Sequence, residues 1–179
     1  MARVPLQRQA DLPDDYQHLL SEDAMGELHL LCAMANNPDI LQSYMRYGTT
    51  LWTEGGLEPA DLERCILTVA RALDAPYEWH QHVPIARDAG VSDDELRAIA
   101  EGDFEPFDDR QQALLRYVDA VVRGDVDDDR FERLSQYLPP ETIVGVTLLA
   151  THYLATARFL DALDIAPEEP FIGWELEGE

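Results

Sequence analysis

The chain has 179 residues, and 36 acidic residues against 13 basic ones give it a formal net charge of −23. All 13 basic residues are arginine, so there is no lysine for a Schiff base or for a phosphate-binding P-loop. The negative charge disfavours nucleic acids and anionic membrane surfaces as partners, because both are bound through basic patches. Hydrophobic residues make up 46% of the chain, which favours a folded domain with a buried core over a disordered segment.

The acidic excess without lysine is typical of a halophile that accumulates salt, because salt screens the repulsion between surface carboxylates. A GC-rich genome would explain the missing lysine but not the acidic excess. Residues 1–9 do not resemble a signal peptide, and the most apolar run, residues 143–150, is too short to cross a bilayer. We therefore expect a cytoplasmic protein. Cys32 and Cys65 have no zinc-type spacing and are expected to be buried core residues.

The periodic segments all predict helices, because apolar residues recur at helical spacing and strand-like alternation does not occur. After a polar lead-in over residues 1–26, we predict helices over residues 27–35, 39–52, 59–73, 76–89, 93–101, 108–123, 130–137 and 140–163. Pro59 and Pro140 favour helix starts, and Ser92 with Glu95 has the pattern of a capping box. We expect one all-α domain of about eight helices over residues 27–166.

Two segments of the second half suggest further packing. Residues 143–150 are apolar on all sides of the predicted helix, which indicates burial in a large core or a subunit interface. The acidic tail over residues 167–179 carries Phe171, Ile172 and Trp174. We expect the tail either to pack on its own domain or to reach a neighbouring subunit.

The densest group of reactive side chains lies between Tyr77 and His82. Glu78 and His82 are four residues apart and share one helix face, so they can form a proton-transfer pair near neutral pH. The alternative is a surface ion pair worth only a few tenths of a kcal/mol. His80 projects from the opposite face and is expected to meet solvent, so the two histidines do not converge on a metal, and we predict no metal site.

A second carboxylate, Glu63, lies near the apolar face of the preceding predicted helix, where an unpaired charge is costly. If the two helices pack antiparallel, Glu63 approaches the face that carries Glu78 and His82. Alternatively, Glu63 reaches solvent or pairs with Arg64 or Arg71.

These residues resemble the carboxymuconolactone decarboxylase family, which shares its all-helical fold with the AhpD-type alkylhydroperoxidases. The resemblance covers roughly residues 27–167 and rests on Leu62-Glu63, Ala75-Pro76-Tyr77-Glu78-Trp79-His80-Gln81-His82, Ile85-Ala86 and Ala89-Gly90-Val91-Ser92. Members of the peroxidase branch carry a glutamate, a C-x-x-C motif and a histidine, which fall here on Glu63, on Ala75 and Glu78, and on His82. Because neither cysteine is present, the resemblance favours the decarboxylase branch, which uses no metal and no organic cofactor.

The resemblance implies a carboxy-lyase that acts on a small carboxylated lactone or a related compound and assembles as a homotrimer or homohexamer. His82 would donate the proton, with Glu78 and Glu63 orienting it or relaying protons. Further pocket residues would be Tyr77, Trp79, His152 and Tyr153, although Trp79 and His152 also suit a buried core. The alternatives are an AhpD-like peroxidase and a non-catalytic oligomeric binding protein of the same fold.

Overall fold

The protein was analysed as a computed structural model, in which residues 1–176 are described. Within this range the chain forms eight α-helices and two short 3-10 helices and has no strand, which confirms the predicted all-α fold. The elements are η1 (Gln9–Asp11), η2 (Asp14–Leu20), α1 (His29–Met34), α2 (Pro38–Glu54), α3 (Pro59–Ala72), α4 (Pro76–Asp88), α5 (Asp93–Glu101), α6 (Asp109–Arg123), α7 (Asp128–Ser135) and α8 (Pro140–Ala162). Each α-helix begins and ends within two residues of its predicted bounds.

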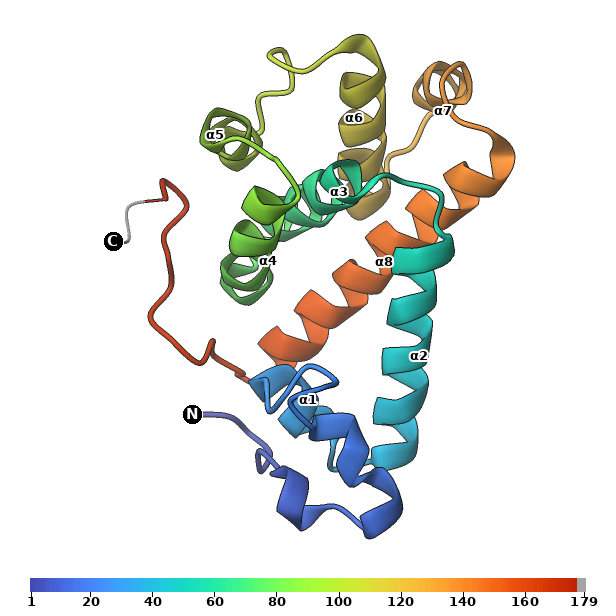
Figure 1. Ribbon diagram of the computed structural model, residues 1–179. Helices are drawn as coiled ribbons and strands as arrows, with labels where there is room; N and C mark the ends of the chain where they lie inside the picture. The colour runs from blue at the N-terminus through green and yellow to red at the C-terminus, as the bar shows by residue number, and fades with distance from the viewer. Residues whose placement is uncertain (177–179) are drawn as a thin grey trace.

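The centre of the fold is α3, which packs against α4, α5, α6 and α8 (Figure 1). Ten of its fourteen residues are buried, so both its apolar and its charged side chains lie inside the domain. Asp61 and Arg64 pair with each other at 2.8 Å, and Arg64 also reaches Glu95 on α5 at 2.7 Å. These pairs satisfy charges that burial would otherwise penalise, and they fix α5 against α3.

The long helix α8 crosses the molecule diagonally, with α2 on one side and the group from α3 to α7 on the other (Figure 1). By length and composition alone α8 could cross a membrane, although its apolar run over residues 143–150 is too short to do so. A buried core helix passes the same test, and α8 packs against α2, α3, α4, α6 and α7. Near its start, a Cβ atom on Gly145 would lie 2.5 Å from the carbonyl oxygen of Gly55, so glycine permits the close approach of α8 to the end of α2.

The N-terminal segment and α2 form a smaller apolar cluster. Leu12, Leu19 and Leu20 are buried there against α1 and α2. By contrast, α2 buries only Leu41 and Leu51 among its seventeen residues. The outer face of α2 is therefore not covered by any of residues 1–176.

The described part of the tail, residues 167–176, packs on its own domain along α4 and α3 (Figure 1). The indole N–H of Trp79 donates to the carbonyl oxygen of Gly173 at 3.1 Å. The ring of Trp174 lies 5.3 Å from that of Trp79, centroid to centroid. The backbone N–H of Ile172 donates to Nδ1 of His80 at 3.2 Å, so His80 is half-buried beneath the tail. The expectation that His80 meets solvent was wrong, because the tail covers that face of α4.

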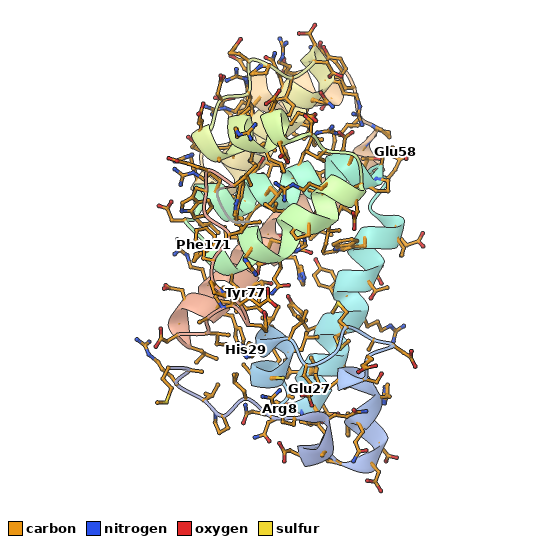
Figure 2. All side chains as sticks on the ribbon, turned by 60° about the vertical axis from the view of Figure 1, so that its left-hand side comes forward. Arg8, Glu27, His29, Glu58, Tyr77 and Phe171 are labelled. Atoms are coloured by element: carbon orange, nitrogen blue, oxygen red, sulfur yellow. The ribbon has the colours of Figure 1, made fainter. Side chains whose placement is uncertain are left out.

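The carboxylate of Glu168 joins the tail to two helices. It accepts hydrogen bonds from the Tyr77 hydroxyl at 2.9 Å and from Nε2 of Gln81 at 2.6 Å, both on α4. It also accepts from the backbone N–H of His29, which lies in the first turn of α1 and has no partner within its helix. Figure 2 shows Tyr77 and His29 close together where α4 meets α1.

Candidate active site

The candidate site is a histidine held between two buried glutamates where α3, α4 and α8 meet. Glu63 comes from α3, and Glu78 and His82 are four residues apart on α4. Nδ1 of His82 lies 2.9 Å from Oε2 of Glu63, and Nε2 lies 3.7 Å from Oε2 of Glu78. The three residues expose 1%, 3% and 7% of their surface for Glu63, Glu78 and His82. The structure thus brings together the three residues predicted to be catalytic.

The surroundings of the imidazole assign a role to each of its nitrogens. A carboxylate can only accept, so Nδ1 of His82 carries a hydrogen and Nδ1–H donates a hydrogen bond to Glu63. Nε2 is too far from Glu78 for a hydrogen bond, because 3.7 Å exceeds ordinary donor–acceptor distances. In neutral His82 the lone pair of Nε2 is therefore available to bind a proton, and in the charged form Nε2–H is available to donate one.

Glu78 titrates in the physiological range. Burial raises its pKa from 4.5 to about 7, and the nearby His82 charge opposes part of this rise. In addition, Oε1 of Glu78 and Oε1 of Glu63 are buried and have no hydrogen-bond partner in the described chain. Buried carboxylate oxygens without donors are costly, so this arrangement favours a role in proton transfer or ligand binding over a purely structural one.

Two aromatic side chains form a wall beside the imidazole. The Tyr153 ring on α8 meets the His82 ring edge-on, with centroids 5.1 Å apart. The Trp52 ring at the end of α2 lies 6.0 Å from that of His82, and its indole N–H donates to the Tyr153 hydroxyl at 3.0 Å. Trp52 is 39% exposed and Tyr153 only 7%, so Trp52 forms the outer edge of the site. Trp52 was not among the predicted site residues, because no motif or spacing places the end of α2 beside α4.

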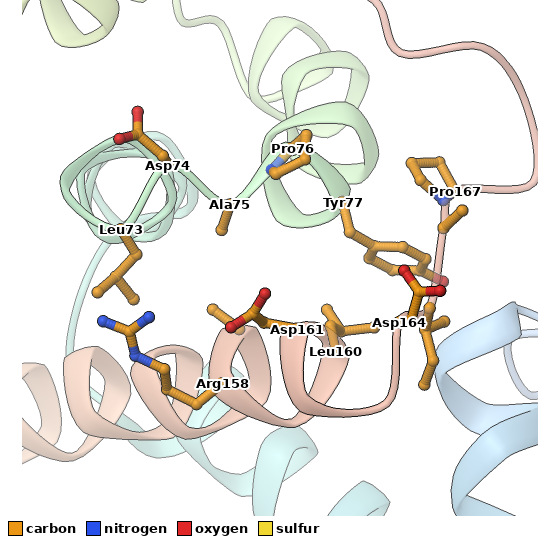
Figure 3. A pocket seen from close by; sticks show the side chains of 13 residues that line it. Leu73, Asp74, Ala75, Pro76, Tyr77, Arg158, Leu160, Asp161, Asp164 and Pro167 are labelled. Atoms are coloured by element: carbon orange, nitrogen blue, oxygen red, sulfur yellow. The ribbon is translucent and has the colours of Figure 1, made fainter. Parts of the chain in front are cut away.

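Of the other predicted pocket residues, one lies beside the site and two point away from it. His152 lies next to the wall, with its ring 5.3 Å from Tyr153 and stacked on Tyr44 at 4.8 Å, and burial lowers its pKa. Tyr77 and Trp79 direct their polar atoms to the tail and to α1. Tyr77 also lines a separate cavity of about 320 Å³ between the α3–α4 turn and α8 (Figure 3).

The cysteines do not form a thiol centre. Cys32 and Cys65 are both free and buried, and burial raises the pKa of each thiol. Because the thiolate is the reactive form, neither cysteine is activated for attack on a peroxide. In the part of the chain that the structure describes, no group of three or more His, Cys, Asp and Glu side chains is arranged to hold a metal ion.

The arrangement of the helices is that of the AhpD-like fold. Residues 38–120 match the Carboxymuconolactone decarboxylase family. The matched segment contains Glu63, Glu78 and His82, the residues that carry the resemblance to this family.

Solved structures share the fold over nearly the whole chain. An uncharacterized peroxidase-related protein from Ralstonia eutropha JMP134, described as an alkylhydroperoxidase AhpD core, is 19% identical with a TM-score of 0.81, covering 97% of this chain and 96% of its own. A peroxidase-related protein from Silicibacter sp. TM1040 is 21% identical with a TM-score of 0.81, covering 96% and 94%. The debrominase Bmp8 in complex with 2,3,4-tribromopyrrole is 16% identical with a TM-score of 0.79, covering 94% and 92%. No curated protein sequence matches the chain.

Proposed function

We propose that the protein is a cofactor-free acid–base enzyme that decarboxylates a small carboxylated lactone or a related cyclic compound. The observation that carries this proposal is the buried His82 imidazole, with Nδ1 hydrogen-bonded to Glu63 and Nε2 facing Glu78. The match of residues 38–120 to the Carboxymuconolactone decarboxylase family supports the reaction class. The aromatic wall of Trp52 and Tyr153 favours a planar ring.

The chemistry divides between bond cleavage and proton transfer. When the bond to the carboxylate breaks, carbon dioxide leaves and the electron pair remains on the ring as a dienolate. Protonated His82 then donates its Nε2 proton to the ring carbon, which restores the neutral imidazole. Glu63 stabilises the charged imidazole before this step, because its carboxylate accepts the Nδ1–H bond at 2.9 Å. Glu78, with a pKa of about 7, supplies the next proton toward Nε2.

The pH dependence follows from the same groups. Above a pH of about 7, Glu78 is ionised and adds a second negative charge that repels an anionic substrate. Below it, Glu78 is neutral and can donate. We therefore expect kcat/KM to fall as the pH rises through about 7.

Two alternatives are less well supported. Peroxide reduction would need an activated thiol, and both cysteines are buried with raised pKa values. A non-catalytic binding protein would have no need for a histidine held at Nδ1 by Glu63 beside a carboxyl group whose pKa is about 7. The proposal includes a homotrimeric or homohexameric assembly, because α2 and α8 present the exposed side chains Tyr47, Val144 and Leu148. Light scattering of the purified protein would measure it.

The test is the loss of 4-carboxymuconolactone absorbance on mixing with purified protein in molar KCl. We compare the wild type with His82→Ala and with His18→Ala, a matched control at an exposed histidine on η2. The wild type and the control should consume the lactone and, in deuterated water, place one deuterium on the product ring. His82→Ala should do neither. Equal turnover by His82→Ala would refute the mechanism, and no turnover by folded wild type would refute the substrate.

A further inference from the structure

The hydroxyl of Tyr153 has an unusual set of hydrogen bonds among the buried and partly buried tyrosines of the described chain. The hydroxyls of Tyr16 and Tyr77 donate to carboxylates, Asp39 and Glu168. The hydroxyls of Tyr44 and Tyr117 each lie 2.8 Å from a threonine oxygen, Thr156 and Thr147. Those threonine hydroxyls already donate to backbone carbonyls, so the two tyrosines are the donors. The Tyr153 oxygen instead accepts from Trp52, and its own proton has no acceptor in the described chain.

This free O–H is buried and stays protonated. Tyr153 is only 7% exposed, so water does not readily replace a missing acceptor. Burial and then the charge of Glu78 raise the pKa of Tyr153, which keeps its hydroxyl in the donor form at neutral pH. The hydrogen bond from Trp52 withdraws charge from the phenol oxygen and strengthens its ability to donate.

The Tyr153 hydroxyl belongs to the same group of side chains as the acid–base pair. Its ring stands at 86° to the His82 ring with centroids 5.1 Å apart, and its Trp52 partner also faces His82. A ligand that reaches Nε2 of His82 would therefore enter the group of side chains that includes the Tyr153 O–H from α8 and the open carboxylate oxygen of Glu78.

We propose that Tyr153 is a catalytic residue whose hydroxyl donates to the substrate oxygen that becomes negatively charged when carbon dioxide leaves, while His82 protonates the ring carbon. This inference rests on the proposed function. It assigns the substrate class as a cyclic compound with a carbonyl oxygen conjugated to the reacting carbon. A preorganised neutral donor stabilises the developing enolate, and it stays in place when His82 gives up its proton to the ring carbon and loses its charge.

The competing explanation is that the bond from Trp52 to Tyr153 serves only to hold α2 on α8. Under that explanation, Tyr153→Phe would weaken the fold but leave ligand binding unchanged. The two explanations therefore differ in what the hydroxyl does to a bound oxyanion.

The experiment compares wild type with Tyr153→Phe and Trp52→Phe, and with Tyr44→Phe as the matched control. Tyr44 is a partly buried tyrosine of the same α2–α8 contact, but its hydroxyl donates to Thr156. One readout is kcat and KM for 4-carboxymuconolactone. The other is the affinity for 4-nitrophenol, an enolate mimic whose absorbance distinguishes phenol from phenolate.

We expect Tyr153→Phe to lower kcat by about 100- to 1,000-fold with a smaller change in KM, as loss of one oxyanion donor does. Binding of 4-nitrophenol should weaken about tenfold, the effect of losing roughly 1.4 kcal/mol of hydrogen bonding. Trp52→Phe should show a smaller loss in both, and Tyr44→Phe should match the wild type. Unchanged kcat and probe affinity in Tyr153→Phe would overturn the assignment.

The two readouts separate failure of this inference from failure of the proposed function. If folded wild type does not consume the lactone, the proposed substrate is wrong, but a probe affinity lost only in Tyr153→Phe and Trp52→Phe still supports an oxyanion donor. If the lactone is consumed equally by wild type and Tyr153→Phe, the function stands and the role of Tyr153 is refuted.

Discussion

Replacing Glu78 with glutamine should remove a pH-dependent loss of stability. Burial raises the pKa of Glu78 from 4.5 to about 7 in the folded protein. A raised pKa stabilises the fold below the unfolded-state value, and this contribution is lost as the pH rises through the folded-state value. At about 1.4 kcal/mol for each pKa unit, the full effect is roughly 3 kcal/mol, of which roughly 2 to 3 kcal/mol falls between pH 5 and pH 8.

Urea unfolding at pH 5 and at pH 8, in the same high salt, measures the effect. The free energy of unfolding of wild type should fall between these pH values by roughly 2 to 3 kcal/mol more than that of Glu78→Gln. Glu58→Gln, at an exposed carboxylate just before α3, is the control and should follow the wild type. If Glu78→Gln and wild type show the same pH dependence, burial does not raise the pKa of Glu78 and the proposed proton donor is refuted.

Three further predictions concern the fold. Gly145→Ala should lower the free energy of urea unfolding by about 1–3 kcal/mol, because its Cβ would meet the Gly55 carbonyl. Thr151→Ala on the exposed face of α8 is the control, and equal stability of the two variants would refute the close approach. Glu168→Ala should lower the free energy of unfolding by about 1–3 kcal/mol and speed proteolysis of the tail, because the tail loses its hydrogen bonds to α4. Glu169→Ala should do neither, and a tail that resists proteolysis equally in both variants would contradict the role of Glu168. Raising KCl from low to molar concentration should raise the midpoint of thermal unfolding by roughly 5 °C; no rise would count against a halophilic surface.

The helices could be predicted because their starts and ends depend on local chemistry. Pro59 and Pro140 begin α3 and α8, and the box of Ser92 and Glu95 begins α5. The two 3-10 helices could not be predicted in the same way. Leu19 and Leu20 are buried there in a segment too short for a recognisable period, so long-range packing decides their structure.

In the candidate site too, the residues set by local spacing could be predicted and those set by long-range packing could not. Spacing placed Glu78 and His82 on one face, and the cost of an unpaired carboxylate on an apolar face pointed Glu63 toward them. Their catalytic roles remain predictions. Trp52 could not be placed from the sequence, because its position over His82 depends on how closely α2 approaches α8. Tyr77 lies beside Glu78 in the sequence but turns to Glu168, since neighbouring helix positions face different directions.

The position of Glu168 has a consequence for the order of events during synthesis. The first turn of α1 emerges from the ribosome early, yet the carboxylate that caps it lies 139 residues further along the chain. Until that residue appears, the backbone N–H of His29 and the outer face of α4 lack their partners, and the contact is of the slow, non-local kind. A nascent chain can therefore build α3 and α4 before Glu168 is made, but the helix that carries Glu78 and His82 is fully anchored only afterwards.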